Sequence, residues 1–551
     1  MEVGIHSAMP TYSGGLGVLS GDTIKAAADV ELPFVAVTLA HRAGYFRQHL
    51  DAEGRQTEEP ASWNPAEHMG LVEERVTVEV EGRAVVVCAW RLDVVGVTGH
   101  VVPVYFLDTE LEENSAEDRR ITDHLYGGDQ RDRLRQEIVL GIGGVKMLRA
   151  VGLEGLDTFH MNEGHSALLG LALLEERTSS GGVEEVAQGL DAVRAACVFT
   201  THTPVPAGHD VFSIGLFEEV LGPTRTALLK EIDVVEDGAI NMTRLALRLS
   251  RYCNGVAMRH AQVSGEMFPD YHIHPITNGV HAATWTGAPM QGVFDEYLPA
   301  WREDPYLLRH AVDIPLERIR RAQREAKEAL LAEVEQRTGK ALDPDRLTLG
   351  FARRAAPYKR ADLLMRDPER LRAMARASGG LQVLYSGKAH PRNNEGKEMI
   401  RRVIEVAGLL EGDLGFAYLE DYDMHLGGLL TAGVDVWLNN PVKPLEASGT
   451  SGMKAALNGV PCLSVLDGWW IEGHVEGVTG WAIGTGWDQP SVTEEEVASL
   501  LDQLEGVVLP LYYHDPEGWA RVMRSSIALN GSHFHARRMM HEYQARAYRT
   551  A

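Results

Sequence analysis

The sequence predicts an α/β protein built from two domains. Its 551 residues exceed what one hydrophobic core usually organises, because single cores stop growing at about 250–300 residues. Short apolar runs alternate with helical patterns in both halves, and buried strands that alternate with helices form parallel sheets. The chain is 44% hydrophobic and 24% charged, and it has neither an apolar stretch long enough to cross a bilayer nor a recognisable signal peptide. We therefore expect a globular, cytoplasmic protein.

The candidate strands fall into two groups. In the first half they are "VVPVYFLDT" (101–109), "LDTFHMNEGH" (156–165) and "AACVFTTHTP" (195–204), with a helix at "HSALLGLALLEE" (165–176). In the second half they are "LTLGFARR" (347–354), "LQVLYSGK" (381–388), "LGFAYLE" (414–420), "VDVWLNN" (434–440) and "PCLSVLDG" (461–468). A long helix at 316–340, with acid and base spaced for pairing, connects the two groups.

These patterns predict four segments. An N-terminal Rossmann-like domain covers 1–290, a connecting helical segment 291–345 and a C-terminal Rossmann-like domain 346–510. The closing helices at 511–551 either cap the second domain or cross back to the first.

Charge and cysteine content exclude several classes of protein. The 78 acidic residues outnumber the 53 basic ones, and the formal charge of −25 argues against nucleic acid as the main partner. Four widely scattered cysteines predict reduced, buried thiols: Cys88, Cys197, Cys253 and Cys462. No cluster of His, Cys or carboxylate residues has the spacing of a metal site.

Polar residues at the carboxyl ends of parallel strands are the candidates for a site, because open α/β sheets bind ligands there. The loop "SGGLG" (13–17) opens a helix whose first N–H groups can hold an anion or a sugar hydroxyl, although on this segment alone a plain tight turn is the favoured explanation. The segment "FARRAAPYKR" (351–360) carries four cations and suits phosphate, or it is a solvated basic turn. His202 follows an apolar strand, where it is either structural or a sugar contact. Glu163 and His165 lie in "NEGH", which binds hydroxyls or caps a helix.

The segment "EASGTSGMKAALNG" (446–459) places a lysine among small residues. Gly449 to Gly452 can expose consecutive N–H groups at the start of a short helix that Asn458 and Gly459 end. Lys454 then lies in the first turn, where the positive end of the helix dipole favours the neutral amine. A neutral lysine beside a phosphate cradle is what covalent attachment of an aldehyde-bearing phosphate ester requires.

This segment resembles the pyridoxal-phosphate lysine segment of the α-glucan phosphorylases, the glycogen, starch and maltodextrin phosphorylases. Further stretches resemble that family's segments in the family's order, over residues 2–480: "SGGLG", "LYGGD", "MNEGHSAL", "FTTHTP", "ITNGV", "RRAAPYKR" and "SGKAHP". The likeness is closest to the short, unregulated members. It implies a glycosyltransferase-B fold, with two Rossmann-like domains facing a central cleft. It also implies phosphorolysis of α-1,4-glucans to α-glucose 1-phosphate with retention, in which the cofactor phosphate shuttles a proton.

The resemblance assigns roles to residues of this sequence. Pyridoxal phosphate would be attached to Lys454, and the remaining cofactor contacts would be Arg353, Gly449, Thr450, Ser451, Gly452 and Tyr422. Arg354 and Lys359 would hold the substrate phosphate, and His202 completes the catalytic set. The other substrate contacts would be Gly14, Gly15, Leu16, Tyr126, Asp129, Glu163, His165, Asn278, Glu446, Ser448 and Gly449. The partners would be a glucan and inorganic phosphate, and the family resemblance suggests a homodimer.

The sequence departs from the family pattern at the cofactor phosphate. Asp423 stands where the long phosphorylases carry an arginine, so one cation is missing or comes from elsewhere, for example from Lys443. Arg353 replaces a lysine, and "APYKR" lacks the histidine and glutamate of the long enzymes' turn. The sequence also starts almost at the glycine loop. We therefore expect that the native start lies upstream of Met1 or that the first sheet is one strand short, and we expect no amino-terminal regulatory segment.

Two other functions would use the same scaffold. A retaining transferase that uses nucleotide sugars would keep the glycine loop and the arginine–lysine pair, but it does not need Lys454. A catalytically silent glucan-binding protein would be expected to lose Lys454 or Arg354, and both are present. Phosphorolysis is therefore the preferred interpretation.

Overall fold

The computed structural model describes residues 1–178 and 183–549, which form two compact units. Unit 1 comprises Met1–Phe46, Pro60–Ile276 and Met540–Ala551, and unit 2 comprises Arg47–Glu59 and Thr277–Met539. The chain therefore leaves unit 1 for one short excursion at 47–59 and returns to it at the end. The predicted domain limits stay a prediction, because units defined by contacts need not coincide with domains that fold alone.

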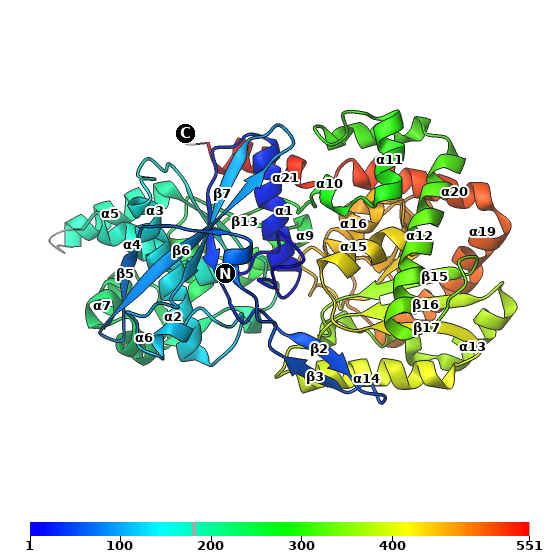
Figure 1. Cartoon of the computed structure of the whole chain (residues 1–551), viewed down its shortest axis with the longest axis horizontal. Helices are drawn as coiled ribbons and strands as arrows, with labels where there is room; N and C mark the ends of the chain where they lie inside the picture. Colours follow the sequence, from blue (N-terminus) through cyan, green and yellow to red (C-terminus); the bar gives the residue numbers. More distant parts are fainter. Residues whose placement is uncertain (179–182, 550–551) are drawn as a thin grey trace. The chain divides into compact units, whose positions relative to one another are not determined.

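Unit 1 contains a parallel sheet with strand order β14-β13-β9-β8, of which Figure 1 labels β13. Its strands are β8 (Phe159–Asn162), β9 (Cys197–Thr200), β13 (Tyr252–Gly255) and β14 (Ile273–Pro275). The central strand β9 is buried along its whole length, as its apolar run predicts. Asn162 and Thr200 are partners in the register of β8 and β9, so the segments that follow both strands start at the same edge of the sheet.

A second sheet of unit 1 is mixed, with strand order β1-β7-β6-β4 and with β5 paired to β6. Its strands are β1 (Ala36–Leu39), β4 (Gly70–Leu71), β5 (Val76–Val80), β6 (Arg83–Val95) and β7 (Val101–Asp108). The strand predicted at 101–109 is confirmed as β7. It runs parallel to β1 but antiparallel to β6, so the prediction that it belongs to a purely parallel sheet is wrong.

Unit 2 is built on a six-stranded parallel sheet with order β17-β16-β15-β18-β19-β20. Its strands are β15 (Leu347–Ala352), β16 (Leu381–Ser386), β17 (Leu414–Leu419), β18 (Val436–Asn439), β19 (Cys462–Val465) and β20 (Gly480–Ile483). The strand order reverses between β15 and β18, and the carboxyl ends of the strands at such a switch point form the usual ligand-binding crevice of an open α/β sheet. The five strands predicted in this half are therefore confirmed, and the α/β fold class with them.

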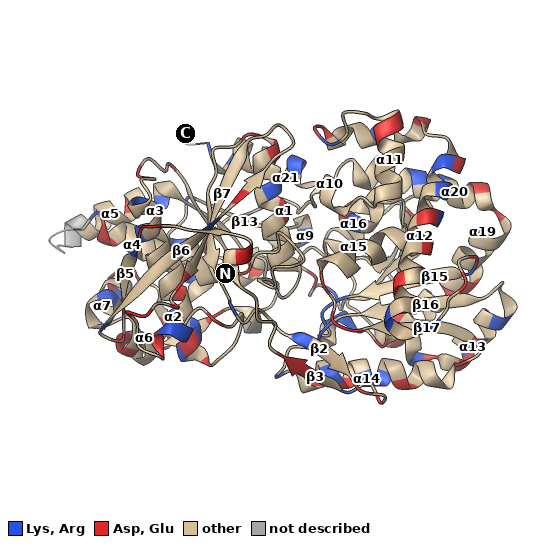
Figure 2. Ribbon diagram, viewed as in Figure 1, with Lys and Arg blue, Asp and Glu red and all other residues tan. Residues whose placement is uncertain are grey.

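The connecting helix α12 (Leu316–Thr338) packs against α15 (Met424–Gly433) within unit 2. It ends at Gly339, whose φ of 70° is the left-handed conformation that glycine adopts at helix ends. Acidic and basic residues are interspersed along the helices of each unit (Figure 2). No helix in the described ranges is long and apolar enough to span a bilayer.

The excursion at 47–59 is an antiparallel hairpin of β2 (Arg47–Leu50) and β3 (Gln56–Glu59), which lies beside α14 (Asn394–Leu409) in unit 2 (Figure 1). The three short strands β10 (Val211–Ser213), β11 (Val235–Glu236) and β12 (Ala239–Asn241) form a further sheet in unit 1. The other α-helices of unit 1 are α1 (Gly15–Asp29), α2 (Gln130–Ile138), α3 (Gly144–Ala150), α4 (Leu168–Glu175), α5 (Val183–Ala196), α6 (Ile214–Val220), α7 (Pro223–Glu231), α8 (Met242–Arg248) and α9 (Met258–Met267). Those of unit 2 are α10 (Ala282–Trp285), α11 (Ala288–Tyr297), α13 (Pro368–Ala377), α16 (Ser451–Leu457), α17 (Trp470–Gly473), α18 (Thr493–Gln503), α19 (Leu509–His514) and α20 (Pro516–Ser525), and α21 (Ala536–Glu542) leads back to unit 1.

All four cysteines are free and buried, as their scatter predicts. Within residues 1–178 and 183–549, no group of three His, Cys, Asp or Glu side chains could hold a metal ion.

Candidate functional site

The predicted site residues divide between the two units. Unit 1 carries the glycine loop, the loop "LYGGD" (125–129) and the strand-end residues: Gly14, Gly15, Leu16, Tyr126, Asp129, Glu163, His165 and His202. We call "LYGGD" the gating loop, after the family segment that it resembles. Unit 2 carries the lysine segment, the basic turn and the asparagine turn: Asn278, Arg353, Arg354, Lys359, Tyr422, Glu446, Ser448, Gly449, Thr450, Ser451, Gly452 and Lys454. Each set is described within its own unit.

Lys454 is buried on α16, with 6% of its surface exposed. Its Nζ lies 3.4 Å from the centroid of the Trp285 ring, a cation–π geometry that an ammonium or a polar adduct can use. Asn458 and Gly459 end the helix as predicted, and Gly459 has a φ of 72°. Lys454 is the fourth of seven helical residues, so it lies at the end of the first turn of α16, close to its predicted place. The influence of the helix dipole falls off within this turn, so its effect on Lys454 is small.

The loop before α16 is shaped by close approaches of the backbone. Gly449 has a φ of 85°, which favours glycine. A Cβ on Gly452 would come within 2.7 Å of Trp469 and 2.9 Å of the Cys462 sulfur, so only glycine fits there. The hydroxyl of Ser448 is buried and finds no hydrogen-bond partner among the described residues. This orphaned hydroxyl, with the first N–H groups of α16, forms a donor set that suits an anion such as a phosphate.

Two cations of the basic turn meet the carboxylate of Glu446. Arg353 Nη2 donates to Glu446 Oε2 at 2.7 Å, and the Lys359 ammonium donates to the same oxygen. All three side chains are at most 9% exposed. Burial alone would raise the pKa of Glu446, but the charges of Arg353 and Lys359 outweigh it and lower this pKa to about 2. Glu446 is therefore an anion that holds both cations at the end of β15.

Arg354 and Tyr422 differ from this buried cluster in exposure. Arg354 is exposed at the end of β15, unlike Arg353. Tyr422 is partly buried, and its desolvation raises its pKa to about 12. The structure thus brings Arg353, Lys359 and Glu446 together by direct contact and leaves Arg354 accessible to an external anion.

The structure places Lys443, the residue suggested as a source of the missing cation, against the loop at 485–486. Its Nζ donates to the carbonyl oxygens of Thr485 at 3.3 Å and Gly486 at 3.0 Å. Asp423 accepts a hydrogen bond from Leu426 N at 2.8 Å as the N-cap of α15. The two hydrogen bonds of Lys443 leave one N–H of its ammonium for another acceptor, so the suggestion that Lys443 supplies the cation stays a prediction.

Asp467 is a residue of this site that sequence reasoning did not place among the site residues. Its carboxylate accepts the Glu446 N–H at 2.9 Å and the Gly468 N–H at 2.9 Å. Trp469 N donates to Ser448 O at 2.9 Å, so the turn at 467–469 pairs with the loop at 446–448. Burial raises the pKa of Asp467 to about 7, and the negative charge of the neighbouring Glu446 contributes to this rise. The sequence signal is that "LDGWWIEGHVEG" (466–477) follows a strand and resembles the family's segment after the lysine helix, which predicts that Asp467 helps to organise the cleft without acting as an acid or base.

Asn278 is 3% exposed, and its Oδ1 makes no hydrogen bond within the described part of the chain. Its backbone carbonyl accepts a hydrogen bond from Arg538 Nη2 at 2.8 Å, which fixes the turn. An orphaned amide oxygen on a fixed turn can accept a hydrogen bond from a ligand hydroxyl.

In unit 1, His202 belongs to a hydrogen-bonded chain at the sheet edge. Its Nε2 lies 2.6 Å from Asn162 Oδ1, and Asn162 Nδ2 donates to Ser20 Oγ at 2.9 Å on α1. Glu163 accepts the His202 N–H at 2.7 Å and the Thr203 hydroxyl at 3.0 Å. Burial lowers the pKa of His202 to about 3, so the imidazole is neutral near pH 7. It therefore donates from Nε2 and keeps a lone pair on Nδ1.

The gating loop is anchored at both of its predicted residues. Tyr126 has a φ of 56°, and its hydroxyl donates to Glu2 Oε1 at 2.9 Å. Glu2 Oε2 in turn accepts the N–H of Ser13 at 2.6 Å, next to the glycine loop. Gly14 is the N-cap of α1, and Gly15 and Leu16 are its first residues. His165 lies buried in the turn after β8.

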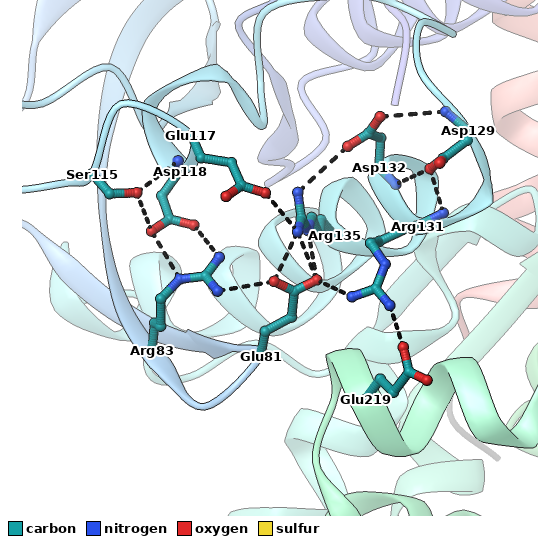
Figure 3. Close-up of polar contacts among 10 residues, drawn as sticks. All are labelled: Glu81, Arg83, Ser115, Glu117, Asp118, Asp129, Arg131, Asp132, Arg135 and Glu219. Carbon is teal, nitrogen blue, oxygen red and sulfur yellow. Dashed lines mark hydrogen bonds and ion pairs between the residues drawn. The ribbon is translucent and has the colours of Figure 1, made fainter.

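Asp129 caps α2, and the same helix is tied down by arginines (Figure 3). Asp129 and Asp132 form a reciprocal capping box. Glu81, in the turn between β5 and β6, accepts from Arg131 at 2.7 Å and from Arg135 at 2.7 Å (Figure 3). Asp129 therefore serves a local structural role in this structure.

Comparison with known proteins decides the family. A model of the carbohydrate phosphorylases matches residues 222–493. The chain is 38% identical to the maltodextrin phosphorylase of Thermococcus litoralis, over 100% of this chain and 70% of that protein. It belongs to the carbohydrate phosphorylase family.

Two further relatives agree with this assignment. The chain is 37% identical to the glycogen phosphorylase of Mycobacterium tuberculosis, over 100% of this chain and 70% of that protein. It is 34% identical to the glycogen phosphorylase of Aquifex aeolicus, over 99% of this chain and 85% of that protein. The resemblance noted from the sequence motifs is thereby confirmed, and with it the expectation of an enzyme of this family.

Proposed function

We propose that this carbohydrate phosphorylase cleaves α-1,4-glucans with inorganic phosphate, releases α-glucose 1-phosphate with retention, and carries pyridoxal phosphate on Lys454. The observation that carries the proposal is the setting of Lys454, a buried amine over the Trp285 ring on a helix that follows a glycine-rich loop. The relatives named maltodextrin and glycogen phosphorylase support the substrate class.

The residues present fit this cofactor. The Lys454 amine offers the covalent attachment, and the first N–H groups of α16, where a Cβ on Gly452 would clash with Trp469, offer donors to its phosphate. Thr450, Ser451 and Gly452 bring those N–H groups, with Gly449 before them, and Tyr422 lies on the loop after β17. When bound, pyridoxal phosphate supplies a phosphate group that exchanges a proton with the substrate phosphate.

The cations of unit 2 would bind the two phosphates. In this proposal Arg353 neutralises the cofactor phosphate, and Arg354 and Lys359 hold the substrate phosphate. Two phosphates in one site repel each other, so they require fixed cations in a chain of strongly negative net charge. Glu446 supplies the fixing contact to Arg353 and Lys359.

Sugar hydroxyls would be bound by orphaned or accepting groups. Asn278 Oδ1 is buried without a partner in the part of the chain described, and Glu446 and Ser448 lie on the loop before α16. In unit 1, His202 Nδ1 can accept a hydrogen bond because Nε2 donates to Asn162. The remaining contacts stay those of the sequence prediction: Gly14, Gly15, Leu16, Tyr126, Asp129, Glu163, His165 and Gly449. A glucan and inorganic phosphate as partners, a homodimeric state and a cytoplasmic location belong to the same proposal.

A direct assay tests the reaction. The purified protein, supplied with pyridoxal phosphate, maltodextrin and inorganic phosphate, should release α-glucose 1-phosphate. Transfer of glucose from a nucleotide sugar to maltodextrin without phosphate should not occur. Transfer from the nucleotide sugar with no phosphorolysis would replace this proposal by the transferase alternative.

A further inference from the structure

The hairpin β2–β3 has one buried face although it is a short excursion of the chain. Along its strands the residues alternate between exposed and inward-facing, and the inward positions are Gln48, Leu50, Gln56 and Glu58. Gln48 is fully buried and Gln56 is 7% exposed. Two buried primary amides are costly unless each donor and acceptor is paired, so their partners explain their presence.

Gln56 binds the backbone of the turn after β16. Its Oε1 accepts the Ala389 N–H at 2.9 Å, and its Nε2 donates to the Ala389 carbonyl at 2.8 Å. The side-chain amide therefore pairs with both backbone groups of one residue, as a neighbouring strand would. Ala389 is fully buried, so no water replaces these bonds.

Gln48 binds the two adjoining backbone segments. Its Nε2 donates to the Gly387 carbonyl at 2.9 Å and to Gln56 Oε1 at 2.8 Å. Its Oε1 accepts the Asp421 N–H at 3.0 Å, after β17. The two glutamines thus form one connected, buried set that joins the ends of β16 and β17 to the hairpin.

The turn that they hold lies directly against the basic turn after β15. Ala355 N donates to the Lys388 carbonyl at 2.9 Å, and Arg353 N donates to the Ser386 carbonyl at 3.2 Å. Gly387 has a φ of 139°, and a Cβ there would overlap the backbone carbonyl of Arg353. Leu50 of the hairpin packs on the small apolar cluster that contains Ala355 and Ala389. The backbone of Arg353 is therefore located by the 386–389 turn, which is located by the glutamines.

We propose that Gln48 and Gln56 are positioning residues for phosphate binding: they fix the 387–389 turn, and this turn fixes the backbone of Arg353–Ala355. The inference rests on the proposed function for the assignment of the basic turn to phosphate. It gives the excursion of the chain at 47–59 a functional reason, because the hairpin completes the support of the phosphate site in unit 2.

The test compares substitutions at successive contacts along this path. Gln56→Met and Gln48→Met keep side-chain length but leave buried backbone groups of the turn unpaired. Gly387→Ala acts one step further on, at the Arg353 backbone. Arg55→Gln is the matched control, since Arg55 is exposed at the hairpin tip and pairs with Asp51 and Glu53 of the same hairpin.

Two measurements separate positioning from a merely structural role. In the holoenzyme, Gln56→Met and Gln48→Met should raise the phosphate KM about tenfold while kcat at saturating phosphate falls less than about threefold. The double variant should show less than the product of the two effects, because both glutamines belong to one network. Arg55→Gln should match the wild type in both constants.

Hydrogen exchange followed by mass spectrometry reads the path without activity. Gln56→Met should speed hydrogen exchange in the peptide that contains Ala389. It should also speed exchange in the peptide that contains Arg353–Ala355, although no hydrogen bond joins Gln56 to these residues. For Gly387→Ala, the expected effect is faster exchange in the Arg353–Ala355 peptide. Faster exchange confined to Ala389 with an unchanged phosphate KM would overturn the inference. If the wild-type protein shows no phosphorolysis, the proposed function is refuted but the positioning role of the glutamines is not. That role is then tested by calorimetric titration of inorganic phosphate into the wild type and into Gln56→Met, which should bind phosphate more weakly.

Discussion

Replacing Glu446 by glutamine tests the buried charge cluster of unit 2. The charges of Arg353 and Lys359 outweigh burial and lower the pKa of Glu446 from its ordinary value of 4.5 to about 2. One pKa unit corresponds to about 1.4 kcal/mol, so ionised Glu446 stabilises the folded state by about 3 kcal/mol. Glu446→Gln should therefore lower the free energy of unfolding at pH 7 by about 3 kcal/mol.

The pH dependence has a definite sign. A carboxyl group whose pKa is lower in the folded state stabilises the protein above its unfolded pKa and loses this effect as the pH falls through the folded value. The difference between wild type and Glu446→Gln should thus be full at pH 7, shrink to about half at pH 3 and vanish below pH 2.

Urea unfolding in phosphate-free buffer measures this difference. Tryptophan fluorescence is a suitable probe because eight of the ten tryptophans lie in unit 2, all except Trp63 and Trp90. Glu411→Gln, an exposed carboxylate of the same unit, is the control and should unfold like the wild type. Equal stability of Glu446→Gln and wild type at pH 7, or a difference that does not change with pH, would refute this account of the cluster.

Three further predictions follow from the described contacts. Arg354→Ala should raise the phosphate KM at least tenfold, measured by initial rates, and should leave the cofactor content unchanged, measured by absorbance of the bound cofactor. An unchanged KM would show that Arg354 does not bind phosphate. His202→Ala should lower kcat with the cofactor retained, and full activity of the variant would make His202 structural. Because burial lowers the pKa of His202 to about 3, the wild-type rate should show no inflection from this group between pH 6 and 8. Lys327→Ala should destabilise unit 2 by about 3–5 kcal/mol in urea unfolding, because Lys327 Nζ lies 2.6 Å from Asp435 at about 1% exposure. Wild-type stability of Lys327→Ala would contradict a role for this ion pair.

The parallel sheets and the family were predictable from the sequence. Fully buried strands such as β15 and β16 appear as continuous apolar runs, and "EASGTSGMKAALNG" carries the resemblance to the family. In each case the signal lies within a few consecutive residues. The strand β6 was missed because its hairpin turn, Glu81-Gly82 with both φ values positive, lacks the usual Asn-Gly or Asp-Gly signal.

The supports of the site could not be predicted in the same way. Gln48 and Gln56 contact backbone groups more than 330 positions away in the sequence, and nothing in "RQHL" or "QTEE" indicates these partners. The position of Trp285 over Lys454 likewise depends on how α10 and α16 pack. The hydrogen bonds of the Lys443 ammonium depend on the position of the loop at 485–486. Sequence patterns indicate which residues end a strand. Which backbone groups lie close enough to hydrogen-bond with those residues depends on the tertiary structure.

The attachment of pyridoxal phosphate to Lys454 is the central claim, and borohydride reduction followed by peptide mass mapping tests it most directly. The purified protein, supplied with pyridoxal phosphate and reduced, should yield a peptide in which Lys454 carries the mass of the reduced pyridoxal phosphate adduct. Lys454→Ala, treated in parallel, should carry no adduct at this segment and show no phosphorolysis. A wild-type protein that acquires no adduct on Lys454, or a Lys454→Ala variant that remains active, would contradict the account.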